Sequence, residues 1–158
     1  MMKRLWTVFA ITLLALAAAG PVLAQSDPFT GTWKLDVAKS KYDPGPAPQS
    51  QMRMWGTDGK VSIEGINAAG KPAKYGYTLL GDGKDYPTMG AIPNGAQTVS
   101  TKKISPNKIE ANFTRDGKHA ETATFSVSKD GKVLNILAKG TSPADGTPFT
   151  NMTVWEKQ

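Results

Sequence analysis

The stretch KIEANFTRDGKHAETATFSVS, residues 108–128, contains the pattern that decides the fold. In residues 108–114 the odd positions are apolar and the even positions are polar, and residues 122–128 repeat this alternation. Because successive side chains of a β-strand point to opposite faces of a sheet, each run predicts a strand with one buried face. Asp116-Gly117 lies between the runs and supplies the positive φ angles of a tight hairpin turn.

Similar runs and turns recur along the rest of the chain at a regular spacing. The interval from Asp82-Gly83 to Asp130-Gly131 is twice the interval from Asp58-Gly59 to Asp82-Gly83, and Pro106-Asn107 lies at its midpoint. One such period corresponds to one pair of strands. The sequence predicts ten strands, at residues 31–37, 50–57, 60–67, 72–80, 84–88, 96–104, 108–114, 118–128, 132–139 and 148–157.

The even number of strands determines how the sheet can close. Ten strands let the first and the last pair antiparallel, whereas nine would require a parallel pair between them. Closure also removes the exposed strand edges that a sheet must otherwise protect. We therefore predict an all-β fold, an antiparallel up-and-down meander closed into a barrel of about ten strands.

The same strand order sorts the turns between the two ends of the barrel. In a meander, turns that are two strands apart lie at the same end, so the turns near residues 58, 82, 106 and 130 should share one closed end with Trp33 and Trp155. The other end, which we call the mouth, receives the loops at residues 38–49, 67–71, 89–95, 115–117 and 140–147. Long loops on a rigid barrel are the usual place for recognition.

Residues 1–24 have the features of a secretory signal peptide. A basic start at Lys3 and Arg4 precedes an apolar stretch, and small residues end at Ala24. We expect cleavage after Ala24, which leaves residues 25–158 as one domain and reduces the formal charge from +6 to +4, because Lys3 and Arg4 are removed. We therefore expect a periplasmic or secreted protein without a membrane span. The mild, scattered positive charge argues against a nucleic-acid partner.

Gly31-Thr32-Trp33 at the start of the first predicted strand resembles the signature of the calycin barrels: lipocalins, fatty-acid-binding proteins and avidins. With the ending VWEKQ, residues 154–158, the resemblance to lipocalin-like secreted bacterial proteins spans nearly the whole predicted domain. It implies that Trp33 packs across the closed end beneath a basic residue of the last strand, for which Lys157 is the candidate. It also implies a small apolar or amphipathic ligand. Biotin is unsupported, because Leu35 stands where avidins carry a ligand-binding asparagine.

Several side chains are candidates for contact with such a ligand. Extending the alternation of residues 109, 111 and 113 places Arg115 inward at the mouth, unless the strand has ended and Arg115 is solvated. Arg53 shares a face with Trp55, while Met52 and Met54 share the other, and either face fits the interior. Aromatic side chains either line a pocket or fill it. The candidate ligand-binding residues are Arg53, Tyr77, Phe113, Arg115, His119 and Phe125.

The sequence offers little for catalysis, metal binding or a cofactor. It contains no cysteine, and His119 is its only histidine, so a histidine-rich metal site is excluded. His119 follows the Asp116-Gly117 turn near the mouth, where it is either a solvated turn residue or the base of a catalytic triad. We expect neither catalytic residues nor a cofactor. Three functions remain: a ligand binder, an interaction module of the cell envelope with a filled barrel, and an enzyme that depends on His119.

Overall fold

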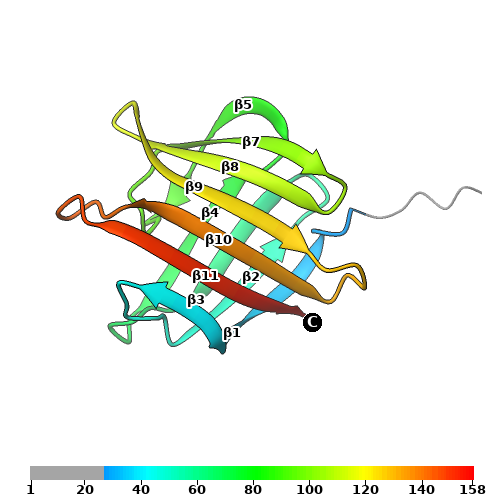
Figure 1. The fold of residues 1–158 in the computed structure, drawn as a ribbon, viewed down its shortest axis with the longest axis horizontal. Helices are drawn as coiled ribbons and strands as arrows, with labels where there is room; N and C mark the ends of the chain where they lie inside the picture. The colour runs from blue at the N-terminus through cyan, green and yellow to red at the C-terminus, as the bar shows by residue number, and fades with distance from the viewer. Residues whose placement is uncertain (1–26) are drawn as a thin grey trace, which may run out of the picture.

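A computed structural model describes residues 27–158, so the expected signal peptide lies outside the described residues. The described chain forms a single antiparallel sheet of 11 strands that curls into a nearly closed barrel (Figure 1). None of these residues forms a helix long and apolar enough to cross a bilayer. The strands are β1 Gly31–Asp43, β2 Ser50–Trp55, β3 Lys60–Ile66, β4 Pro72–Thr78, β5 Asp82–Pro87, β6 Met89–Gly90, β7 Thr98–Ser105, β8 Lys108–Arg115, β9 Lys118–Val127, β10 Val133–Thr141 and β11 Pro148–Lys157.

The first and last strands meet as predicted. β1 pairs antiparallel with β11, with Trp33 opposite Lys157 and Leu35 opposite Trp155. The strand order around the barrel runs β5-β7-β8-β9-β10-β11-β1-β2-β3-β4-β6. Outside residues 82–90, each strand therefore pairs with the strands that precede and follow it in the chain, as in a meander. The prediction of an all-β, antiparallel up-and-down barrel is confirmed, and this arrangement is compatible with a lipocalin-like fold.

The segment of residues 82–90, between β4 and β7, pairs differently from our prediction. We predicted one strand at residues 84–88 after a tight turn at Asp82-Gly83, but Asp82-Gly83 lies at the start of β5, where the register with β7 shifts. β5 pairs with β7 alone, and the chain then changes partner, so that β6 pairs with β4 through Tyr75–Gly90 and Gly76–Met89. The predicted strand therefore corresponds to β5, whereas β6 lies in the segment of residues 89–95 that we predicted to be a loop of the mouth.

The first strand is also longer than predicted. β1 continues to Asp43 instead of ending at residue 37, and its register with β11 shifts between Asp36 and Lys41. The prolines that prevent regular pairing begin only at Pro44, so residues 41–43 remain free to pair with the long strand β11. The loop at the mouth is therefore shortened to residues 44–49.

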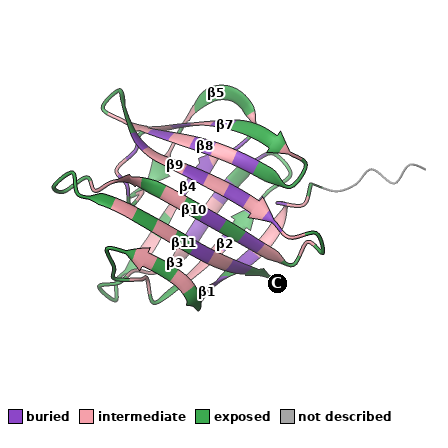
Figure 2. Cartoon of the chain, in the orientation of Figure 1, coloured by how far each residue is buried: buried purple, intermediate pink, exposed green. Residues whose placement is uncertain are grey.

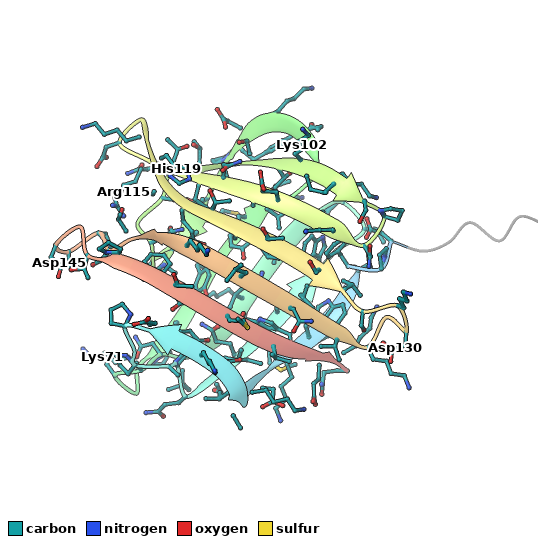
Figure 3. The ribbon with its side chains drawn as sticks, in the orientation of Figure 1. Lys71, Lys102, Arg115, His119, Asp130 and Asp145 are labelled. Atoms are coloured by element: carbon teal, nitrogen blue, oxygen red, sulfur yellow. The ribbon has the colours of Figure 1, made fainter. Side chains whose placement is uncertain are left out.

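The two ends of the barrel are sorted largely as the sequence predicts. The β8–β9 turn has both positive φ angles, 52° at Asp116 and 71° at Gly117. Figure 3 shows Lys71, Arg115 and Asp145 near one end of the barrel and Asp130 at the other. The turns at residues 56–59, 106–107 and 128–132 link consecutive strands at the closed end.

Burial alternates along the strands (Figure 2). Large buried side chains pack in the closed half of the barrel. Trp33 is fully buried and donates a hydrogen bond from Nε1 to the carbonyl oxygen of Phe29 at 2.8 Å. Lys157 Nζ lies 5.0 Å from the centre of the Trp33 ring, which is the contact that the resemblance implies. The buried side chains at or near this end include Phe29, Trp33, Leu35, Trp55, Val61, Val127 and Leu134.

Candidate functional site

The half of the barrel nearer the mouth contains a cavity of about 490 Å³. Its walls come from seven strands, β1, β2, β4, β8, β9, β10 and β11, and from the loops at residues 44–49, 67–71, 91–97 and 142–147. Five prolines form part of its lining in these loops. The aromatic lining residues are Tyr42, Tyr75, Tyr77, Phe113, Phe125, Phe149 and Trp155. The cavity is therefore a largely apolar space with a small number of polar groups.

β11 shows how the character of the lumen changes with depth. Its alternate residues Trp155, Thr153, Asn151 and Phe149 all line the cavity. Trp155 lies deepest, because it pairs with Leu35 near the closed end, and Phe149 lies nearest the mouth, next to the β10–β11 loop. The buried aromatic cluster thus gives way to polar side chains halfway along the strand.

Arg53 forms the polar part of the cavity floor. It lies on β2 opposite Trp33 and Ile63, so the inward face of β2 is the one that carries Arg53 and Trp55. Its side chain is only 5% exposed. The guanidinium carbon lies 4.6 Å from the ring centre of Trp155, 5.7 Å from that of Phe125 and 5.8 Å from that of Tyr77. These rings come from three strands, so the charged group lies within the lumen and is held by cation–π contacts.

The hydrogen bonds of Arg53 are incomplete. Nη1 donates to the hydroxyl oxygen of Tyr77 at 2.6 Å, while Nε is buried without a partner. Among residues 27–158 there is no carboxylate within ion-pair distance of this guanidinium. A buried cation without a matched anion is costly, because most of its hydration is lost. The floor therefore carries a positive charge that the described residues do not neutralise by direct contact.

Glu121 brings the second charge to the cavity. It lies on β9 opposite Phe113, and it accepts a hydrogen bond from Asn94 Nδ2 at 2.8 Å. Burial raises the pKa of its carboxyl group, and the hydrogen bond from Asn94 and the charge of Arg53 oppose this rise. Within the described chain, Arg53 and Glu121 are the two charged residues in the cavity lining.

Other polar groups in the wall also lack full partners. Asn151 Oδ1 is buried and accepts no hydrogen bond. Burial raises the pKa of the Tyr42 hydroxyl to about 12, against the opposing charge of Arg53, and burial also raises the pKa of the Tyr75 hydroxyl. These hydroxyls therefore remain protonated at neutral pH and are available as hydrogen-bond donors.

Four of the six candidate ligand-binding residues line this cavity: Arg53, Tyr77, Phe113 and Phe125. Arg115 does not. Its Nη1 donates to the carbonyl oxygens of Asn94 and Thr141, at 2.6 and 3.2 Å, and its Nη2 donates to Thr141 Oγ1 at 3.2 Å. At the end of β8 the side chain reaches the loop at residues 91–97 and the end of β10, so it joins them at the mouth instead of entering the lumen.

His119 also lies outside the cavity lining. The alternation of β9 would place it inside with Ala123 and Phe125, but the register with β8 shifts beside Ala120, which is buried in its place. His119 is exposed, and its Nε2 lies 2.8 Å from Thr122 Oγ1. Figure 3 places it near Arg115, at the mouth end. Within residues 27–158 no group of three or more potential metal-ligating side chains is present.

Three functional candidates were missed in the sequence. Glu121 shares the odd-numbered alternation of Ala123 and Phe125, so its inward direction was available from the pattern. Asn151 lies in the predicted last strand, two positions from Thr153 and four from Trp155, which gives the same signal. Asn94 lies in a loop without periodicity, and nothing in the sequence indicates that it contacts Glu121.

Comparison of the sequence with protein-family models gave no match, and comparison with curated proteins gave none either. The functional argument therefore rests on the geometry and chemistry of the lumen.

Proposed function

We propose that the protein binds a small apolar or amphipathic molecule inside its barrel. The observation that carries this proposal is the cavity of about 490 Å³ in the half of the lumen nearer the mouth. Pockets for small molecules usually measure roughly 300–1,000 Å³ and combine apolar walls with a few polar groups. Aromatic side chains supply the walls here, and Arg53, Glu121 and Asn151 supply the polar groups. Membership of the lipocalin-like proteins is part of this proposal and agrees with the barrel and with the contact between Trp33 and Lys157.

The alternative, an interaction module of the cell envelope, predicts a barrel filled with side chains. Only the closed half matches that expectation, because the large buried residues Trp33, Phe29 and Leu134 lie there. The open half contains small residues, including Ala73, Ala123 and Ala138, at positions that line the cavity. This distribution favours a binder. We further propose that binding takes place outside the cytoplasm, a proposal that rests on the signal-like sequence of residues 1–24.

A fluorescence titration with the neutral probe N-phenyl-1-naphthylamine tests the proposal. Ala138 lines the cavity, whereas its neighbour Leu137 is 37% exposed on the opposite face of β10. We expect the probe to bind the wild type, Ala138→Trp to weaken binding by at least about tenfold because the indole occupies the lumen, and Leu137→Trp to retain binding. Circular dichroism would verify that both variants are folded.

Two results would contradict a ligand-binding lumen. One is an absence of binding to the folded wild type. The other is equal weakening by Ala138→Trp and Leu137→Trp, because the probe would then contact the protein elsewhere. Export has its own test: the mass of the protein recovered from outside the cytoplasm should correspond to a chain that begins at Gln25.

A further inference from the structure

The charges of the lumen indicate what kind of amphipathic molecule fits it, and this step rests on the proposed function. The cavity lining contains one cation, Arg53, and one carboxylate, Glu121, among the described residues. Glu121 is hydrogen-bonded to Asn94 of the loop at residues 91–97, whereas Arg53 lies on the floor next to Trp155. The two groups do not form an ion pair. The deeper end of the cavity is therefore positive.

The surroundings of Arg53 hold the guanidinium in place but leave part of it without hydrogen bonds. Three aromatic rings surround it, and one N–H group donates to Tyr77. The Tyr77 hydroxyl accepts this hydrogen bond, so its own proton is available for another acceptor. A guanidinium edge and a hydroxyl proton side by side form a site for an acceptor with two oxygen atoms.

We propose that the lumen binds an amphipathic monocarboxylic acid head first, with the carboxylate on Arg53 and Tyr77 and the apolar tail directed toward the mouth. The carboxylate would accept hydrogen bonds from the remaining N–H groups of Arg53 and from the Tyr77 hydroxyl. It would neutralise the buried cation, which the described residues leave without a direct counter-ion.

The charge balance favours a single negative charge. One cation lies at the floor, so a phosphate monoester with two charges would bring one unpaired negative charge into a largely apolar space. A cationic head group would be repelled by Arg53. A neutral alcohol would form hydrogen bonds but would leave the charge of Arg53 unpaired. A carboxylate is therefore the best match in charge and in shape.

The rim of the cavity explains the orientation of the tail. Pro44, Pro46, Pro143, Ile92 and Phe149 all line the cavity in or beside the loops of the mouth. Lysine and arginine are absent from the lining of this rim within the described chain, Arg115 being bonded to Asn94 and Thr141 outside it. An apolar tail fits this rim, and an anionic group would lose its hydration there without gaining a cationic partner.

Binding of three molecules with the same tail tests the proposal: dodecanoate, dodecan-1-ol and dodecyltrimethylammonium, each measured by displacement of N-phenyl-1-naphthylamine. We expect the wild type to prefer dodecanoate. Arg53→Met should weaken dodecanoate binding by at least about tenfold, because charge-assisted hydrogen bonds are lost, while dodecan-1-ol binding is kept or improved. Lys102→Met is the matched control, because it removes an exposed positive charge from β7 and should leave all three affinities unchanged.

A carbon-13 NMR titration of carboxyl-labelled dodecanoate gives a second measurement that needs no variant. The pKa of the bound carboxyl group should lie below its value in free solution, because Arg53 stabilises the ionised form. Equal affinity for acid and alcohol, together with an unlowered pKa, would overturn the head-first carboxylate while the binding function stands. A failure of the neutral probe and of all three molecules to bind would instead contradict the binding function itself.

Discussion

At the scale of single residues, the lumen separates its two charges by their surroundings. Arg53 is surrounded by aromatic rings and donates a hydrogen bond to one hydroxyl. Glu121 depends on one amide hydrogen bond from Asn94 in a mostly buried position, and burial raises its carboxyl pKa. Bringing a second carboxylate into the same lumen would favour a proton on Glu121. The lumen thus holds one cation among aromatic rings and one carboxyl group whose protonated form is favoured by burial.

The raised pKa of Glu121 predicts a pH dependence of stability. The folded protein holds this proton to a higher pH than the unfolded chain, whose carboxyl pKa is near 4.5. The contribution of Glu121 to stability is therefore fully present below pH 4.5 and is lost as the pH rises through the folded pKa. We expect the free energy of unfolding of the wild type, relative to Glu121→Gln, to fall by on the order of 1 kcal/mol between pH 4 and pH 7.

Urea unfolding of both proteins across this range measures the difference. Several aspartates have lowered pKa values, among them Asp36 and Asp130 through hydrogen bonds to neighbouring groups, and they make stability rise with pH. Both proteins contain these aspartates, so their contribution cancels in the comparison. If the difference in unfolding free energy between the two proteins stays flat or rises with pH, burial does not raise the pKa of Glu121.

At the scale of elements, the mouth depends on contacts between loops. Arg115 at the end of β8 bonds to Asn94 in the loop at residues 91–97 and to Thr141 at the end of β10, and Asn94 bonds in turn to Glu121. These bonds connect the loop at residues 91–97 with the strands beneath it. The position of this loop therefore depends on these polar contacts as well as on Ala96, which is buried in the core, and on Ile92, which packs against it.

Removing the central arginine should loosen this loop. We expect Arg115→Met to speed amide hydrogen exchange in residues 91–97 by at least about tenfold, because hydrogen bonds to a charged group are lost. Arg115→Lys should have an intermediate effect, because a lysine keeps the charge but cannot bond to both loops with a planar fork. The closed-end turn at Asp130 serves as an internal control. Unchanged exchange in residues 91–97 would mean that Arg115 does not hold the loop.

The elements also show what the sequence could predict. Alternation gave the bounds of β11 without error and those of β8 to within one position, because both strands have one buried face throughout. It failed for residues 82–90, where the chain changes strand partner, since pairing partners are not encoded in the alternation of a single strand. Alternation also gave no sign of the extra residue in β9 at Ala120, where the register with β8 shifts and beyond which His119 is exposed.

At the scale of the whole molecule, the barrel is closed unevenly. β1 and β11 pair through residues spread over their lengths, from Trp33 to Asp43, whereas β4 and β6 pair through two residue pairs. β5 contributes nothing to the ladder with β4. The seam between β4 and residues 82–90 is therefore the weakest line in the sheet.

Hydrogen exchange of the wild type should reveal this seam. We expect the amides of residues 82–90 to exchange at least about tenfold faster than those of β1 and β11, because few ladder hydrogen bonds protect them. The comparison is internal to one protein and needs no variant. Equal protection of both regions would show that the seam is as stable as the β1–β11 junction.

The sequence predicted the cavity only in part. The alternation identified Tyr77, Phe113 and Phe125 as inward side chains, but whether they fill or line the lumen depends on how small residues such as Ala123 and Ala138 are distributed around the barrel. The direction of Arg53 remained open because both faces of β2 carry large side chains. These properties arise from the packing of several strands together.

The position of β11 between β10 and β1 has a consequence for how the protein is made. A chain synthesised from its N-terminus forms β1 early, yet one edge of β1 stays without its partner until the final strand emerges. An unpaired edge invites association with other chains, and pairing between distant segments slows folding. Trp155, Thr153 and Asn151 arrive on that same strand. The wall of the cavity is therefore completed only at the last step of assembly, when β11 pairs with β1 and β10.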